Sequence, residues 1–356
     1  MSKAEAFRVS LRPTSKRSKT LSTSIAQTNR ETISRYWGQL DATSAHDLPE
    51  LVRQYTAPDI EWHGPQPFND IDGVESLIET WWLPLRRAFP DLRRRCDVLL
   101  AGSFRGQDWV SASGYYEGTF AADWLGIAAT GEKTCVRFGE IMALEAGKIV
   151  KTYWLTDLMD VMQQGGFHLG WAAPATEGLR PRVKYGGGII SSEQDPRATQ
   201  QTLRLVEAML FGLVRKDQPM SLYWTEDMFW NSPSGVGTAT GLDDFLRRVH
   251  HEFLRGLGGG WSGSHNARYA EGRFAVSTGW PSLVAEHTGF FLGQEPTGNY
   301  LSWRIMDFWE RKGDLLTSNW VHIDMVDVFM QMDVDIFERY RQYRREKESE
   351  QRADGG

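Results

Sequence analysis

Two aspartates in this sequence stand where a strand pattern turns into a helix pattern, and a carboxylate at such a junction could carry a proton. Asp157 lies within residues 147–166, and Asp324 lies within the similar stretch 313–333. Alternate residues before each aspartate fall on one strand face, and apolar residues after it recur at helical spacing. Apolar surroundings raise the pKa of a carboxyl group, which suits it to remove a proton next to a carbonyl. General acid/base catalysis is therefore one prediction for both positions.

The same junction has a structural interpretation. An aspartate before a helix often caps it, because its side-chain oxygen accepts a hydrogen bond from a backbone N–H in the first turn. For Asp157 this would be the amide of Asp160. Capping favours the ionised carboxylate and lowers its pKa, which opposes a role as a general base. The residues alone leave both interpretations open.

Aromatic and histidine side chains could complete a site around each aspartate. In the first stretch Trp62 and Tyr153 could form an aromatic wall, and His63 could face a developing enolate oxygen as a donor or relay a proton. In the second stretch His322 lies two residues before Asp324, so both could share one strand face and the acid could orient the imidazole. A structural hydrogen-bonded pair explains these last two residues equally well.

The opening strands of the two halves can be aligned without gaps. Residues 59–65 and 227–233 share Asp, Trp and Pro at matching positions. The alignment places Trp230 opposite the tryptophan of the first half and puts Asn231 in the position of the histidine. Trp320 falls on the same predicted strand face as the second aspartate, where it could contact a substrate.

Two arginines occupy similar strands just before the last strand of each half. Arg137 and Arg304 could each clamp a carboxylate or an enolate oxygen if buried, whereas a solvent-facing position or an interdomain salt bridge is the commoner outcome. Glu140 and Asp307 lie three residues further on and carry the same two interpretations.

The order of predicted elements repeats, which indicates a duplicated domain. Helix patterns precede a run of strand patterns in each half, and this segregation favours an α+β fold. Between the halves, Pro and Gly residues mark a linker. We predict the following organisation: a disordered basic tail (1–26), a first domain (27–168), a linker (169–198), a second domain (199–340) and a charged tail (341–356).

The composition is that of a globular protein, and it argues against several function classes. A chain of 356 residues exceeds the size at which one core keeps growing, and its net charge of −6 argues against nucleic acid as the main partner. The two cysteines form no CxxC motif and fit a reducing cytoplasm, and no apolar run is long enough to cross a membrane. No His/Cys spacing typical of a metal site occurs. The fifteen tryptophans indicate either plain core or the lining of an apolar pocket.

A set of short motifs spans the first half. They are Trp62-His63-Gly64-Pro65, Gly73, Ala88-Phe89-Pro90-Asp91-Leu92 and Gly147-Lys148-Ile149-Val150, followed by Tyr153, Asp157 and residues 163–165. Together they resemble the SnoaL-like polyketide cyclases and ester-cyclase-type proteins of the nuclear transport factor 2-like superfamily. The second half keeps Trp230, Gly241, Gly313, Trp320 and Asp324 but lacks the Phe-Pro-Asp-Leu segment.

The resemblance implies an α+β fold of two tandem cone-shaped domains (nuclear transport factor 2-like, cystatin-like). Each would have three helices packed on a curved, mainly antiparallel sheet, with an apolar pocket between them. In the cyclases of this family, an Asp at the position of Asp157 acts as general acid/base in an intramolecular aldol ring closure, without a metal or organic cofactor.

We therefore predict a cofactor-independent, polyketide cyclase-like enzyme (a cyclase, isomerase or lyase) that acts on a small apolar or aromatic carbonyl compound. The first pocket is the expected working one. The predicted catalytic residues are Asp157, His63, Asp324 and His322, and the predicted substrate-binding residues are Trp62, Tyr153, Trp320, Trp230, Asn231 and Arg137. The alternatives are an epoxide or ester hydrolase on the same scaffold and a non-catalytic small-molecule-binding module.

The expected partners follow from the same resemblance and composition. The two domains are expected to pair within the chain as a pseudo-dimer, and a further homodimer stays open. We expect no nucleic acid or membrane partner, no metal, no cofactor and a cytoplasmic location.

Overall fold

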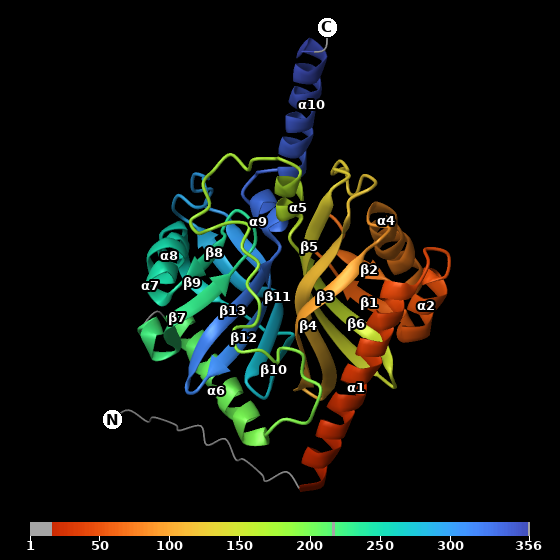
Figure 1. The fold of residues 1–356 in the computed structure, drawn as a ribbon. Helices are drawn as coiled ribbons and strands as arrows, with labels where there is room; N and C mark the ends of the chain where they lie inside the picture. Colours follow the sequence, from red (N-terminus) through yellow and green to blue (C-terminus); the bar gives the residue numbers. More distant parts are fainter. Residues whose placement is uncertain (1–15, 216–217, 355–356) are drawn as a thin grey trace.

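The computed structural model describes residues 16–215 and 218–354, which form two halves of similar make-up (Figure 1). The elements of the first half are α1 (Lys16–Ala42), α2 (Leu48–Tyr55), β1 (Thr56–His63), β2 (Asp70–Asp72), α3 (Val74–Leu77), η1 (Ile78–Trp82), α4 (Leu83–Ala88), β3 (Arg93–Phe104), β4 (Gln107–Thr119), β5 (Lys133–Glu145), β6 (Lys148–Thr156) and α5 (Leu158–Gln164). The elements of the second half are α6 (Pro196–Arg215), η2 (Met220–Leu222), β7 (Trp224–Asn231), β8 (Thr238–Thr240), α7 (Leu242–Asp244), η3 (Phe245–His250), α8 (His251–Gly256), β9 (Leu257–Ser262), β10 (Ala267–Glu271), β11 (Phe274–His287), β12 (Tyr300–Lys312), β13 (Leu315–Ile323), α9 (Met325–Gln331) and α10 (Ile336–Asp354).

Each half builds one curved sheet with the same strand order. The first sheet runs β2-β1-β6-β5-β4-β3, and the second runs β8-β7-β13-β12-β11-β10, with β9 also paired to β11. In both sheets the pair of opening and last strands (β1 with β6, β7 with β13) is parallel and the other pairs are antiparallel. The predicted α+β fold of two tandem domains with curved, mainly antiparallel sheets is confirmed.

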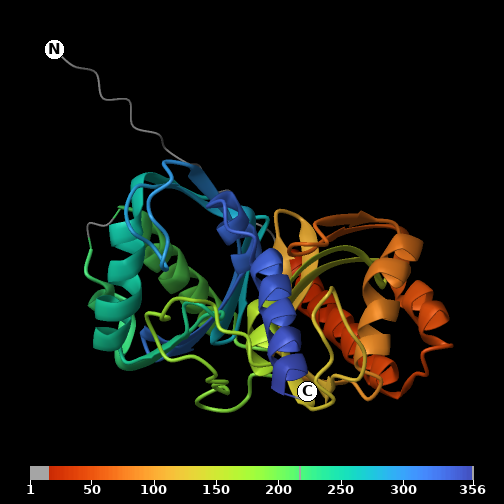
Figure 2. The ribbon, with the colours of Figure 1, turned by 90° about the horizontal axis from the view of Figure 1, so that it is seen from above.

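The two sheets meet through their outer faces, while their inner faces are covered by helices. Figures 1 and 2 show α7 and α8 on one outer flank and α2 and α4 on the other, with the two sheets between them and α5, α9 and α10 near the middle. Apolar side chains from both outer faces form one buried group, which we call the interface cluster. It contains Val98, Leu100, Trp109, Ile141, Ala143, Tyr153, Leu155, Ile190, Phe229, Ala267, Tyr269, Phe274, Val276, Met306, Phe308 and Trp320.

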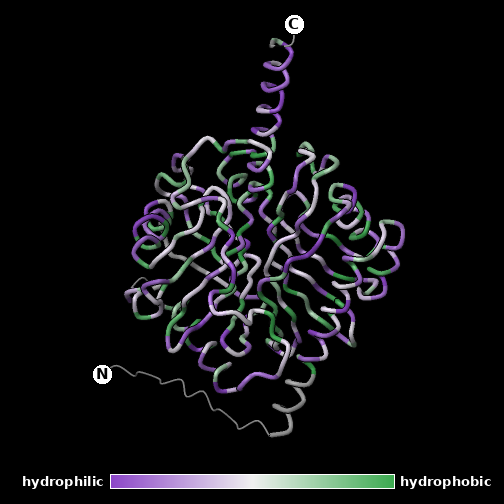
Figure 3. The backbone as a smooth tube through the Cα atoms, viewed as in Figure 1, coloured by the Kyte–Doolittle hydropathy of each residue, from purple (hydrophilic) through white to green (hydrophobic). Residues whose placement is uncertain are grey.

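The ends of the chain depart from the expected pattern. Helix α1 begins at Lys16, inside the segment that the sequence assigned to a disordered tail. No Gly or Pro occurs between Lys16 and Trp37, so nothing interrupts helix propensity there. Residues 1–15 of the predicted tail lie outside the described residues. At the other end, α10 projects from the body as a strongly hydrophilic helix (Figure 3).

One long strand of the second half continues through an irregularity. Strand β11 runs from Phe274 to His287, and a register shift between Gly279 and Leu283 lets it continue along β12.

None of the helices within residues 16–215 and 218–354 combines the length and apolar character needed to span a bilayer.

Candidate functional site

The two junction aspartates lie where the halves meet and bind backbone amides on both sides. Asp157 accepts a hydrogen bond from the N–H of Asp160 at 3.0 Å and another from the N–H of Ser234, in the other half, at 2.7 Å. Asp324 repeats the arrangement in reverse, accepting from Asp327 at 3.2 Å and from Gln66 at 2.9 Å. Each aspartate therefore caps its own helix and holds a loop of the opposite half.

We call the pairs Asp157–Ser234 and Asp324–Gln66 the reciprocal clasp. Burial raises the pKa of Asp157. Burial, followed by the nearby Asp327, also raises the pKa of Asp324 to about 7, although Arg304 at 3.1 Å and the amides oppose the shift. Both carboxylates have their oxygens engaged by the protein, an arrangement that stabilises the fold.

The predicted aromatic wall of Trp62 and Tyr153 does not exist, because these residues lie on opposite faces of the first sheet. The register pairs Trp62 with Thr152 and His63 with Tyr153. Trp62 therefore points inward with Trp154, at a ring distance of 6.0 Å, while Tyr153 belongs to the interface cluster. Successive residues of a strand point to opposite faces of the sheet, so an error of one residue in the assignment places a side chain on the wrong face.

The two histidines predicted to be catalytic also lie on the interface side. His63 contacts Asp70 at 2.8 Å between Nδ1 and Oδ1, and its ring stacks on Tyr153. His322 is buried, and its Nε2 lies 2.9 Å from the hydroxyl of Ser113 in the other half. Its polar contact is with this serine rather than with Asp324, so the predicted orientation of the imidazole by the acid is not realised.

The remaining predicted site residues lie either at the junction of the two halves or in the interior of the second half. Arg137 donates to the backbone oxygen of Asn231 at 3.0 Å, and both border a polar pocket of about 20 Å³ next to Asp157. Trp320 belongs to the interface cluster, whereas Trp230 lines the interior of the second half.

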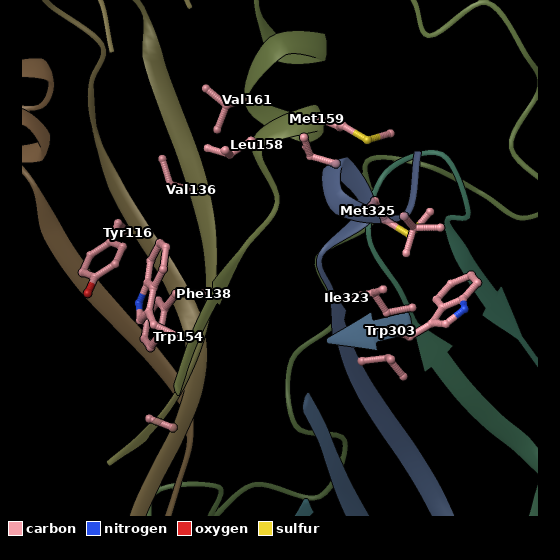
Figure 4. Close-up of a cluster of buried hydrophobic side chains, with 14 of the residues drawn as sticks. Tyr116, Val136, Phe138, Trp154, Leu158, Met159, Val161, Trp303, Ile323 and Met325 are labelled. Atoms are coloured by element: carbon pink, nitrogen blue, oxygen red, sulfur yellow. The ribbon is translucent and has the colours of Figure 1, made fainter. Parts of the chain in front are cut away.

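Large aromatic rings fill the interior of the first half. Trp81 lies 5.8 Å from Trp62 and 4.0 Å from Trp154, measured between ring centroids. Figure 4 shows Tyr116 and Phe138 beside Trp154 on the same sheet. A cavity of only about 10 Å³ is left next to Arg94, which is about the size of one water molecule. A larger hollow near Phe68 and Trp124 is open at the surface.

A buried ion pair completes this interior. Arg94 lies 2.8 Å from Glu140, and both side chains are less than a tenth exposed. The guanidinium also lies over the rings of Trp37, Tyr116 and Phe138. The acid of the first interior is thus neutralised and enclosed, which leaves it no access to a substrate.

The interior of the second half contains a cavity of about 130 Å³. Its walls come from α6, η2, η3, α8 and four strands, and most of the side chains are apolar. The lining residues are Met209, Leu210, Leu213, Met220, Trp224, Trp230, Phe245, Val249, His250, Phe253, Leu283, Ile305, Asp307, Trp309, Asn319, Val321 and Ile323.

Three substitutions between the halves explain why one interior is open. Gly73 and Gly241 both begin a helix with positive φ (82° and 94°), and their N–H groups bond Ile60 and Met228, respectively. Counting from these glycines matches Trp81 with Val249. Strand registers around the paired acids match Trp154 with Val321, and Phe138 with Ile305. Each aromatic ring of the first half is replaced by a smaller aliphatic side chain.

Asp307 is the acid of the second cavity and occupies the position of Glu140. It accepts a hydrogen bond from the amide of Asn319 at 3.2 Å. Burial raises its pKa to about 7, and the amide only partly opposes this. Neither Lys nor Arg occurs among the described residues that line the cavity. Asp307 therefore titrates near neutral pH inside an apolar chamber.

Two further polar side chains line the same cavity. Trp309 is buried, and its indole N–H is buried as well and has no hydrogen-bond partner among the described residues. His250 stacks on Phe245 with ring centroids 5.8 Å apart. Across the described parts of the chain, no group of three or more His, Cys, Asp or Glu side chains is placed to hold a metal ion.

Sequence reasoning gave Asp307 two interpretations and did not connect it to a pocket. The usable signal was the joint loss of aromatic residues at 249, 305 and 321 relative to the first half. That signal becomes visible only when all elements of the repeat are aligned, because the three positions lie on different elements.

Comparisons with known proteins find one matching family model and several similar solved structures, each covering part of the chain. Residues 39–165 match the model of the SnoaL-like polyketide cyclase family. Similar solved structures include a protein from Jannaschia sp. CCS1 provisionally named a SnoaL-like polyketide cyclase (21% identity, 39% of this chain and 92% of that chain, TM-score 0.34). IdmH from Streptomyces antibioticus, provisionally named a polyketide cyclase, is also similar (21% identity, 39% and 99%, TM-score 0.32). No curated protein sequence matched the chain.

Proposed function

Because residues 39–165 match the SnoaL-like polyketide cyclase family, we propose that this chain is a cofactor-independent enzyme that moves a proton on an apolar carbonyl compound. The reaction would be an aldol-type ring closure or an isomerisation. We place the working site in the second half, which repeats the topology of the first. The observation that carries this proposal is a single acid, Asp307, in an apolar cavity of about 130 Å³.

Asp307 is the proposed general acid/base. Its carboxylate takes a proton from the carbon next to the substrate carbonyl, the electron pair of that C–H bond forms a C=C bond, and the π pair of the C=O bond moves to the oxygen to give an enolate. In an isomerisation, the protonated Asp307 returns the proton to another carbon. In a ring closure, the enolate carbon attacks a second carbonyl, and Asp307 protonates the alkoxide that forms.

The surroundings of Asp307 suit this chemistry. A general acid/base works best when its pKa is close to the working pH, and burial raises the pKa of Asp307 to about 7. Asn319 holds one carboxylate oxygen at 3.2 Å and so limits the rotation of the side chain.

The first half has a supporting role in this proposal. Its acid Glu140 is paired with Arg94, and aromatic rings occupy the space that a substrate would need. The residues first predicted to be catalytic, Asp157 and His63, bind protein groups at the junction of the halves.

Proton abstraction can be tested without knowing the natural substrate. Small apolar ketones in D₂O exchange the protons next to their carbonyl, and NMR follows this exchange. We expect Asp307→Asn to lower the enzyme-dependent rate by about 10²–10⁴-fold, because the base is removed.

The decisive comparison is with Asp157→Asn, which alters the reciprocal clasp. Exchange should continue in this variant at close to the original rate per folded molecule. The proposal fails if Asp157→Asn abolishes exchange while Asp307→Asn retains it.

The cavity lining also supports a second candidate, a binding module without catalysis, because most of its side chains are apolar. Equal ketone binding by the original protein and Asp307→Asn, with no exchange by either, would favour it. The hydrolase alternative has less support, since the described lining residues hold neither an arginine nor a second acid to activate water.

A further inference from the structure

The size of the second cavity restricts its ligand. An apolar cavity of about 150 Å³ in another protein holds benzene, so about 130 Å³ accommodates one six-membered ring or an equally compact molecule. Two or three fused rings would need the walls to move apart. The family match by itself says nothing about this limit, since it covers the other half of the chain.

The walls of the cavity resist expansion. Trp224, Trp230 and Trp309 are each less than a tenth exposed and are wedged against neighbouring elements. Phe253 packs edge-on against Trp230 and contacts Trp303 behind it. Displacing such rings would open voids elsewhere, and protein interiors tolerate voids poorly.

The charges around the cavity restrict the ligand further. The titratable side chains on its lining are Asp307 and His250, and the described lining residues include no Lys or Arg. An anionic ligand would enter a mainly apolar chamber without a Lys or Arg partner and next to the carboxyl group of Asp307, which makes its desolvation costly. In the first half Arg94 supplies such a cation, but it is already bound to Glu140.

The polar atoms of the cavity match a ligand with one principal oxygen. Few polar side chains, among them Asp307 and Asn319, interrupt a lining that is otherwise mainly hydrocarbon. A neutral carbonyl or hydroxyl oxygen could hydrogen-bond with one of these groups, whereas a polyhydroxylated ligand would leave most of its polar groups without partners.

We propose that the second half binds an uncharged, single-ring carbonyl or hydroxyl compound and excludes multi-ring polyketides. This inference depends on the proposed function only in assigning turnover to Asp307, because the size and charge limits apply to binding alone.

A graded set of ligands tests the proposal. Binding is measured by the change in fluorescence of the tryptophans that line the cavity, at pH 8. The probes are 2-methylcyclohexanone (one ring), 1-tetralone (two rings), anthrone (three rings) and cyclohexanecarboxylate (one ring, anionic). We expect the single-ring ketone to bind at least about tenfold more tightly than anthrone and than the carboxylate, where tenfold is 1.4 kcal/mol.

Two variants show whether the signal comes from this cavity. Val321→Trp introduces the side chain that fills the first half, and Ile305→Phe is a milder filling in case the first variant does not fold. At least one folded variant should lose most of its binding of the single-ring ketone. Binding that is unchanged in a folded, filled variant would overturn the proposal.

The remaining outcomes separate this inference from the proposed function. Tighter binding of anthrone or the carboxylate, or no binding of the single-ring ketone, would contradict the size and charge limits. Selective binding of the single-ring ketone without proton exchange would support the limits and contradict the proposed catalysis.

Discussion

The two halves share a strand order but have opposite interiors. In the first half, Glu140 is bound to Arg94 and surrounded by aromatic rings. In the second half, Asp307 occupies the same position and faces a cavity of about 130 Å³. The acid is retained in both halves, while its cation and the surrounding ring volume differ. This difference separates a group that holds the fold together from a group that is available for chemistry.

Duplication makes this division stable. The outer faces of both sheets are buried in the interface cluster, so each half needs the other to cover its apolar surface. The first half can therefore have a filled interior and still stabilise the protein, because its outer face continues to cover the outer face of the second half. The reciprocal clasp joins the halves through equivalent residues, as expected for a two-fold related interface.

The largest expected difference in stability concerns the paired acids. Glu140→Gln leaves the charge of Arg94 buried without a partner, so we expect the free energy of unfolding to fall by about 3–5 kcal/mol. Urea denaturation measures this loss. Asp307→Asn is the matched control and should cost much less, because no cation among the described lining residues depends on Asp307. Equal losses would contradict the distinction between the two acids.

Exchanging the wall residues tests the packing difference. Trp154→Val removes a buried ring from the first half, and we expect a loss of about 2–4 kcal/mol from the cavity that it leaves. Val321→Trp places a ring into the existing cavity of the second half. It should therefore lower the free energy of unfolding less than Trp154→Val does. Thermal and urea denaturation of both variants measure the difference. If Val321→Trp proves the more damaging substitution, the second interior has less free space than the structure indicates.

The pH dependence gives a further test of Asp307. Proton abstraction needs the ionised carboxylate, so the exchange rate should rise about tenfold per pH unit below pH 7 and level off above it. The pKa of Asp307 in the folded state lies above its ordinary value of 3.8, so Asp307 favours folding most below about pH 4. That contribution is lost as the pH rises through 7. Asp307→Asn should remove the pH dependence of the rate but only part of the pH dependence of stability, because the pKa values of Asp157 and Asp324 are raised as well. Rates and unfolding curves of the variant across this pH range measure both effects.

The smallest effects are expected at the reciprocal clasp. The carboxylate of Asp157 accepts hydrogen bonds from two backbone amides, and Asp157→Asn leaves only one oxygen to accept them. We expect the free energy of unfolding to fall by about 1–2 kcal/mol. Asp324→Asn should cost somewhat more, because Arg304 lies 3.1 Å from Asp324 and also loses its partner. Denaturation curves provide the values. Large losses of exchange activity with unchanged stability would return these residues to the candidate catalytic set.

Much of the fold followed from local patterns. The repeated motifs, the alternation along the strands and the order of the elements predicted two α+β halves, because these signals are carried by neighbouring residues. The capping interpretation of Asp157 was also available from sequence, since an N-cap depends on three or four consecutive residues, and Asp324 caps its helix in the same way. Trp62 and Trp230 are buried in the main core.

Other features required the tertiary structure. A strand pattern indicates that two faces exist, but the partner that covers each face decides which one is the pocket. Tyr153 and Trp320 thus lie in the interface, one residue away from the inward positions. The cavity depends on the sum of side-chain volumes from α6, η2, η3, α8 and four strands, a quantity that no single stretch of sequence contains. The sequence by itself determined the duplication and the acid in each copy, and packing decided which acid remained accessible.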